Sequence, residues 1–444
     1  MRIIFKSRCV MHRENLTKLV IASIMTSLSL VVLTTTPASA QSAPAAIPNS
    51  AFERDRNVNV LARPRPEYES LGIRRGAFIW HPTVTGNVAY SDNVFAAEEN
   101  EEEDVIITVR PSLLVESDWT SNQLEAFATL EHQEFIENGS ESDTGYALGV
   151  SGRLDVSRAT YVRAGSSYRR AYERRTSVGP NSISNEPIEF EQSKFFISAG
   201  REAGRVRIRL DADYLDSNFQ DAEQSDGTPI DLDFRDLGQA SVSGRLDYAI
   251  SPETAIFARV GFTDVDHDQT PVNGLSRNRE TLTGQLGADF ELSNLLRGRI
   301  GVGYFDTNFA SADLTDVDGF GFDGRLEWFA TPLITITANG SRGTRTSELL
   351  ISPATTQTRI GGQADYEFKR NIIFSAGYDL IDDNYNFIDR TDVRETAYLS
   401  SLILFNPNFG LDLQLSRRSL NSKGAQAQSD FNETRLLLGF KWQL

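Results

Sequence analysis

The feature that most constrains the fold of this chain is an alternation of apolar and polar residues that repeats from Phe78 to the C-terminus. In 205–214 the even positions are apolar or aromatic and the odd positions are Arg or Asp, and 281–292 follows the same rule. Successive side chains of a β-strand point to opposite faces, so a period of two indicates strands with one apolar and one polar face. The pattern predicts an all-β protein.

About 18 segments follow this pattern, with 16 as the alternative count. Short connections such as Ser157-Arg158 and Thr331-Pro332 alternate with long ones such as 217–235 and 266–278. A half-exposed sheet of a soluble exported protein would alternate in the same way locally, but it has no reason to alternate its loop lengths. Short turns on one side and long loops on the other are typical of a transmembrane antiparallel β-barrel. We expect the strands at 78–90, 104–117, 122–135, 143–156, 159–173, 190–202, 205–216, 236–250, 254–265, 279–293, 296–307, 318–330, 332–343, 357–369, 371–383, 391–405, 408–419 and 431–444.

The N-terminus is typical of an export signal. A basic region precedes the largely apolar stretch 19–33, and Ala38-Ser39-Ala40 is a small-residue cleavage site. The apolar stretch is short for a membrane anchor. We therefore predict a signal peptide at 1–40, a periplasmic N-terminal extension at 41–77 and an outer-membrane barrel at 78–444.

Aromatic residues support the barrel. The phrase Tyr-x-Asp/Asn recurs where strands enter long loops, and further aromatic residues lie near the short turns. These positions predict two girdles at the membrane interfaces, a simpler explanation than a binding motif. The girdle residues are Tyr90, Tyr214, Tyr304, Tyr378, Tyr248, Phe290, Trp328 and Tyr366.

The last strand resembles the signal read by the barrel-assembly machinery, which is an expected partner. Gly439, Trp442 and Leu444 fit its Gly-x-x-apolar-x-apolar ending. The strand departs from that signal at Leu437, where a polar residue is usual, and in ending on Leu rather than on an aromatic residue.

Composition excludes several functions. Cys9 is the only cysteine and would leave with the signal, so disulfides and thiol chemistry are not expected in the mature protein. Four histidines supply a metal or catalytic site poorly, and His267 alone is expected in a loop with acids nearby. Net charge is −17, and removal of a signal of net charge +4 would leave about −21. Nucleic acid is therefore not an expected partner. We expect no enzyme, cofactor or metal site.

The polar parity predicts a wet interior. About 16 to 18 strands enclose an aqueous channel rather than a packed core. Arginines on this face either form ion pairs with acids of neighbouring strands, the simpler expectation, or line a track for anions or sugars. The candidate lumen-lining residues are Arg153, Arg163, Arg207, Arg209, Asp211, Asp213, Arg245, Arg259, Arg299, Arg325, Glu327 and Arg359.

The long loops are acidic. Asp264-Val-Asp266-His-Asp268 begins like a calcium loop, but it lacks the Gly and the distant Glu, so weak divalent bridging to lipopolysaccharide is the better expectation. The loop 174–189 is long enough to fold inward as a constriction, although the sequence does not decide this.

One region resembles a known family. Arg63-Pro-Arg-Pro-Glu-Tyr-Glu-Ser-Leu-Gly-Ile-Arg74, Gly76-Ala-Phe78, Pro82, Tyr90-Ser-Asp-Asn-Val-Phe95 and Val109-Arg-Pro-Ser112 resemble the opening of the putative β-barrel porin 2 family of alphaproteobacteria. The resemblance implies a role near exopolysaccharide synthesis and export. It implies no catalytic or ligand residues.

Together these observations predict an outer-membrane channel with both termini in the periplasm, in contact with lipid and lipopolysaccharide. Its solute would be a saccharide, an exopolysaccharide or another small polar molecule. The alternative is a non-conducting structural or adhesive barrel, and an outer-membrane hydrolase is a more distant third.

Overall fold

A computed structural model describes residues 57–177, 183–269, 275–293 and 295–444. The predicted signal peptide lies outside these residues. The described residues contain no helix that is long and apolar enough to span a membrane.

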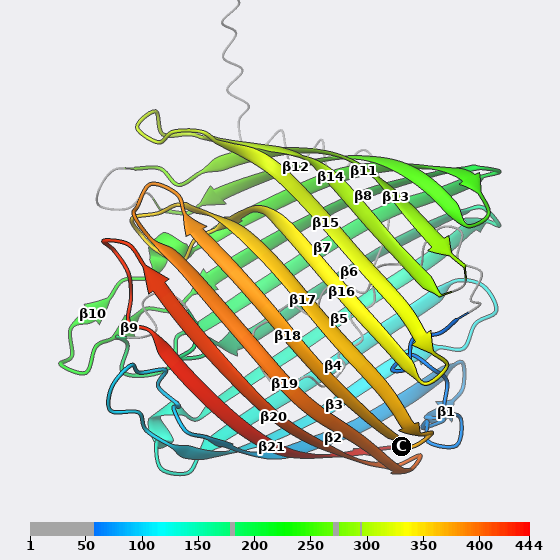
Figure 1. Ribbon diagram of the computed structural model, residues 1–444, viewed down its shortest axis with the longest axis horizontal. Helices are drawn as coiled ribbons and strands as arrows, with labels where there is room; N and C mark the ends of the chain where they lie inside the picture. Colours follow the sequence, from blue (N-terminus) through cyan, green and yellow to red (C-terminus); the bar gives the residue numbers. More distant parts are fainter. Residues whose placement is uncertain (1–56, 178–182, 270–274, 294) are drawn as a thin grey trace, which may run out of the picture.

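The chain forms one closed ring of obliquely running strands (Figure 1). Its sheet has 19 strands, of which β1 is a three-residue addition, so 18 strands make the wall. Each wall strand is antiparallel to its neighbours in chain order; β8 pairs with β11, and β21 closes the ring on β2. The strands are β1 (Ile73–Arg75), β2 (Phe78–Ser91), β3 (Asp104–Ser117), β4 (Gln123–Phe135), β5 (Asp143–Ser157), β6 (Thr160–Tyr172), β7 (Glu189–Ala203), β8 (Val206–Phe219), β9 (Ala222–Glu223), β10 (Pro229–Ile230), β11 (Leu237–Ser251), β12 (Thr254–His267), β13 (Arg279–Leu292), β14 (Leu296–Phe309), β15 (Val317–Thr331), β16 (Ile334–Thr346), β17 (Ala354–Lys369), β18 (Ile372–Tyr385), β19 (Thr391–Asn406), β20 (Phe409–Lys423) and β21 (Phe431–Gln443).

The predicted barrel of about 18 strands is confirmed, and the alternative of 16 is wrong. The main difference lies at the long loops, where strands run further than expected: β16 reaches Thr346, β17 already begins at Ala354, and β20 reaches Lys423. Ladder hydrogen bonds continue there after the apolar alternation has ended, because water outside the membrane does not prevent strands from pairing.

The wall has two rims. Thr83 near the start of β2 is opposite Gln443 at the end of β21, so both ends of the wall lie at one rim, together with the short turns. We call this the short-turn rim and the opposite end the long-loop rim. β1 extends the short-turn rim by pairing with β2 through a tight turn at Gly76, whose φ of 66° suits glycine.

The outer face carries the apolar parity. Leu210, Leu286 and Leu438 are exposed on it. Seven of the eight predicted girdle residues are exposed, and Phe290 is half-buried. The hydroxyls of two girdle tyrosines donate hydrogen bonds to carboxylates: Tyr90, next to the long-loop end of β2, to Glu103, and Tyr378, at the middle of β18, to Glu395, each at 2.5 Å. An aromatic ring on an apolar face with its hydroxyl bound to an acid suits a membrane interface.

Six aromatic side chains lie over glycines on the neighbouring strand. An added Cβ on such a glycine would meet the ring at 2.2 to 2.6 Å. Cross-strand rings over glycine fill the gap that a missing side chain leaves in a curved wall. The pairs are Phe127–Gly149, Tyr161–Gly200, Phe196–Gly165, Phe257–Gly287, Tyr398–Gly377 and Phe440–Gly86.

Candidate functional site: the lumen and its two rims

The inner face of the wall is polar. All twelve candidate lumen-lining residues lie on wall strands, and each has the parity opposite to the exposed apolar residues of its own or the paired strand. The structure thereby places them around the lumen, while their contact with a solute stays a prediction. Leu437 of β21 also points inward and is 4 % exposed. This leucine, by which the last strand departs from the assembly signal, therefore occupies a lumenal position.

Most of the arginines on this face have carboxylate partners. Arg245 contacts Asp247 at 2.6 Å and Asp289 at 2.8 Å, and Arg299 contacts Asp289 at 2.7 Å. A second group joins Arg297 and Arg325 to Glu327, at 2.5 and 3.0 Å. Further pairs are Arg153–Asp155, Arg209–Asp211 and Arg359–Asp379. Four of these eight contacts join different strands, as the simpler expectation of a wall stiffened by cross-strand ion pairs requires, and the other four lie within one strand.

Some arginines also face one another. Arg245 lies directly opposite Arg209 on β8 and Arg259 on β12, and Arg153 lies opposite Arg163. Among these, Arg259 is exposed on the inner face of the wall. The inner wall therefore combines neutralised pairs with at least one accessible cation, a surface that hydrogen-bonds well to hydroxyl-rich or anionic solutes.

The loop between β6 and β7 folds inward at the long-loop rim. Thr176 accepts a hydrogen bond from Arg418 of β20 at 3.1 Å, although β20 is on a distant part of the ring. Arg175 forms a buried ion pair with Glu141 at 2.5 Å and donates to the Ser184 carbonyl at 2.7 Å. These contacts carry part of the loop across the mouth of the barrel, as its length allowed.

A chain of contacts links the β6–β7 loop to the β8–β11 loop, and that loop through Arg277 to the β12–β13 and β16–β17 loops. Arg235 pairs with Glu173 at 2.6 Å, while Arg277 donates to the carbonyls of Phe234 at 3.1 Å and Ser347 at 2.6 Å. Burial, together with the nearby charges of Arg279 and Arg235, lowers the pKa of Arg277 to about 10. Loops that are far apart in sequence are thereby linked at the mouth.

His267 is not a loop residue, contrary to the expectation. It is the last residue of β12, opposite Leu237, and is 6 % exposed on the inner parity. The strand is longer than the apolar alternation indicated, which carries His267 into the ladder. Elsewhere, His81 lies 3.7 Å from Glu116, and His132 shares a 2.8 Å hydrogen bond with Thr144. None of these three contacts joins a histidine to a serine or to a pair of acids.

The structure contains a cluster of carboxylates, but it is not formed by the acids of the possible calcium sequence, Asp264, Asp266 and Asp268. In the part of the chain that the structure describes, the carboxylates that meet within 4.8 Å are those of Asp221, Asp231 and Asp233. All three belong to the loop between β8 and β11, and exposed acids of this kind occur without a metal ion.

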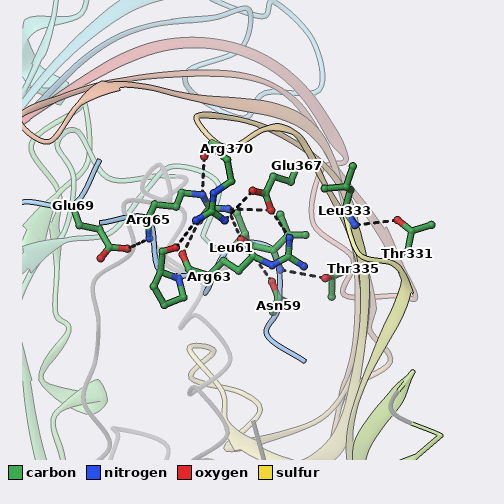
Figure 2. A network of polar contacts seen from close by, with 12 residues as sticks. Asn59, Leu61, Arg63, Arg65, Glu69, Thr331, Leu333, Thr335, Glu367 and Arg370 are labelled. Atoms are coloured by element: carbon green, nitrogen blue, oxygen red, sulfur yellow. Dashed lines mark hydrogen bonds and ion pairs between the residues drawn. The ribbon is translucent and has the colours of Figure 1, made fainter. Parts of the chain in front are cut away.

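The short-turn rim contains a feature that the sequence patterns missed. Residues Asn57–Glu69 of the extension, here called the N-terminal strap, lie against lumen-facing side chains of β15, β16 and β17 (Figure 2). Figure 2 shows Asn59, Arg63 and Arg65 of the strap turned toward Thr335, Glu367 and Arg370 of the wall. The sequence of the strap has no period of two, because the strap makes side-chain contacts and does not join a ladder. Its Arg-Pro-Arg-Pro sequence was the only feature that set it apart.

Residues 65–444 match the family described as Putative beta-barrel porin 2. The chain belongs to this family. As a putative β-barrel porin 2 protein, it has the porin-like barrel of an outer-membrane protein, and families of this kind are in general not enzymes. A comparison with curated proteins finds no match.

Solved structures similar to this putative β-barrel porin 2 protein include outer-membrane proteins. OccAB2 of Acinetobacter baumannii is 14 % identical, with a TM-score of 0.48, over 83 % of this chain and 100 % of that one. OpdK of Pseudomonas aeruginosa is 12 % identical, with a TM-score of 0.44, over 82 % and 99 %. A BenF-like porin of Pseudomonas fluorescens Pf-5 is 11 % identical, with a TM-score of 0.45, over 83 % and 99 %. Similarity of this extent says nothing about the solute of any barrel.

Proposed function

We propose that this protein is a passive outer-membrane channel for a polar solute, and that the solute is a saccharide or an exopolysaccharide. The observation that carries the proposal is the polar inner wall of a closed ring of 18 strands. A ring of this size leaves room for water, and a wall of arginines and acids is costly to pack dry. The choice of polysaccharide rests on the resemblance described above.

The proposed orientation places the short-turn rim and both chain ends in the periplasm and the long loops outside. Support comes from the asymmetry between the two rims, since outer-membrane barrels have short periplasmic turns and longer extracellular loops. In this orientation the girdle tyrosines Tyr90, Tyr304 and Tyr378 would meet the lipopolysaccharide leaflet, where divalent ions could bridge it to the acidic loops.

Single-channel recording in planar bilayers tests the channel. The purified, folded protein should insert and show stepwise conductance in simple salt. A protein that inserts, yet stays silent at every voltage, would contradict the proposal.

The solute needs a separate test. A strain without the gene should export less surface polysaccharide than the wild-type strain, and plasmid-borne protein should restore export. Unchanged export would sink the polysaccharide assignment while leaving a general channel in place.

A second candidate is a non-conducting structural or adhesive barrel. The specific observation in its favour is that segments fold inward at both rims: the β6–β7 loop at one and the N-terminal strap at the other. The bilayer recording distinguishes this candidate from the channel.

A further inference from the structure

We infer that the N-terminal strap is a constriction of the lumen, held by an arginine latch on Glu367, and that it sets the conductance of the short-turn end. The effect on conductance rests on the proposed channel function, whereas the docking of the strap does not.

The first residues of the strap contact three adjacent wall strands. Asn59 donates through its amide to Thr337 at 3.4 Å and Glu327 at 3.5 Å, and the Val60 N–H donates to the Thr335 hydroxyl at 3.2 Å. The Asn57 carbonyl accepts from Arg297 at 3.4 Å. Val60 is 0 % exposed, so this end of the strap is packed against the wall and not merely near it.

The latch is a group of three arginines around one carboxylate. Arg63 forms an ion pair with Glu367, Arg65 lies 3.9 Å from it, and Arg370 of the wall lies 3.3 Å from it. The Glu367 side chain is 2 % exposed. A carboxylate buried to this degree is stable only with its cations, so loss of the strap arginines would leave Arg370 as its remaining partner.

Arg65 also fixes the shape of the strap. Its guanidinium donates to the carbonyls of Val60 at 2.6 Å, Arg63 at 3.0 Å and Arg370 at 3.0 Å. Arg370 donates in return to the Pro64 carbonyl at 3.0 Å. Pro64 and Pro66 fix the backbone φ angle at two positions of the strap. The bend with which the strap passes over the wall residues is therefore preformed.

The position of the strap gives it control of passage. Thr335 is the second residue of β16 and Glu367 the third from last of β17, which places these contacts at the short-turn mouth, within roughly 7 Å of the strand ends at the usual rise of a strand. The contacts are made by lumen-facing side chains, so the strap occupies space that a solute would otherwise cross.

The strap is separable from the wall. The hydrogen-bonded ladders between β15 and β16 and between β16 and β17 continue beside the strap. Within the described residues, the strap does not pair with either ladder as an additional strand. Its contacts are polar, apart from Val60, and those of the latch depend on the charge of Glu367. An element held in this way can be released while the barrel stays closed.

The first experiment releases the latch. Arg63→Ala/Arg65→Ala and Glu367→Gln should each give a unitary conductance roughly twofold larger than that of the wild-type protein, because the released strap would leave the space that it occupies in the lumen beside β15, β16 and β17. Arg74→Ala is the matched control: it removes an arginine of the same extension, from the exposed Arg74–Asp118 pair, and should conduct like wild type.

The second experiment locks the strap. Because the only native cysteine, Cys9, lies in the predicted signal peptide, Val60→Cys/Thr335→Cys alone should form a disulfide on oxidation, visible as a reductant-sensitive shift on a gel. Combined with Arg63→Ala/Arg65→Ala, the oxidised protein should show the wild-type conductance, and reductant should raise it.

Each failure has a distinct meaning. A folded barrel whose cysteines do not cross-link would show that the strap is not docked, and equal conductance of the locked and released forms would show that it is not a constriction. Silence of every variant, with the cross-link formed, would overturn the channel and the role of the strap together.

Discussion

At the scale of single residues, buried ion pairs hold the loops in place. Arg175 and Glu141 are 7 % and 3 % exposed, and Arg175 also donates to carbonyls of its own loop. Parity predicted which face each wall residue takes, but it could not predict partners. Asp289, for example, serves arginines on two other strands, a choice set by register and side-chain length rather than by spacing.

Arg175→Ala should release the β6–β7 loop. Removing one partner of a buried pair costs about 3–5 kcal/mol, because the other charge stays buried without compensation. Limited proteolysis should then cut within the loop much faster than in the wild-type protein. Arg153→Ala, which removes the more exposed pair with Asp155, should change cleavage little. Equal cleavage of both variants would contradict this account.

At the scale of elements, the strands depend on glycines covered by rings. On β13, a Cβ on Gly287 would lie 2.3 Å from the Ile300 carbonyl oxygen and 2.4 Å from the Phe257 ring, whereas a Cβ on Gly284 would meet nothing within 4 Å. Alternation predicted the strands because it reports on faces. It did not predict these pairs, because a glycine has no side chain to show a parity.

Gly287→Ala should therefore destabilise the barrel by about 1–3 kcal/mol, the usual cost of overpacking. Gly284→Ala on the same strand is the control and should be close to neutral. The measurement is the temperature at which the folded band on a gel converts to the unfolded band. Loss of stability in both variants alike would point to glycine content rather than to the ring contact.

The loop between β8 and β11 should depend on pH through Asp236. Burial, and repulsion by Asp233, Asp268 and Asp216, raise the pKa of Asp236 to about 6, while it accepts hydrogen bonds from the Phe219 N–H at 2.7 Å and the Asn218 amide at 2.9 Å. Since the folded pKa is above the unfolded one, the folded loop is favoured below the unfolded pKa, and this advantage is lost as pH rises through about 6.

Hydrogen exchange at the Phe219 amide, corrected for its intrinsic rate, measures this effect. Protection should fall by about tenfold between pH 5 and pH 7.5, because at pH 5 a carboxyl with a pKa of about 6 is mostly protonated in the folded loop but already ionised in the unfolded one. Asp236→Asn should abolish the dependence. The same slope in both proteins would assign it to another group.

At the scale of the whole molecule, closure depends on the last strand. Trp442 is opposite Val84 of β2 and Phe409 of β20, and Leu444 donates its N–H to the Pro82 carbonyl at 3.2 Å. Strand number and closure followed from sequence because every strand repeats the same pattern. What lies inside the ring did not follow, since the strap and the inward loops follow no period.

Trp442→Ala/Leu444→Ala should lower the amount of folded barrel in the outer membrane several-fold, if these residues form the signal for assembly. Leu438→Ala removes another exposed residue of β21 and is the matched control. The fraction of heat-modifiable protein in purified outer membranes is the readout. Equal yields from the two variants would remove the assembly role.

The meeting of β2 and β21 at one rim also governs how such a ring can change in size. If a single strand were added or lost, the last strand would end at the opposite rim and could pair with the first only in parallel fashion. A hairpin can, because it leaves at the rim where it entered. The unit that widens or narrows this ring while keeping its antiparallel closure is therefore two strands with their loop, so each widening step adds a loop to the long-loop rim and each narrowing step removes one.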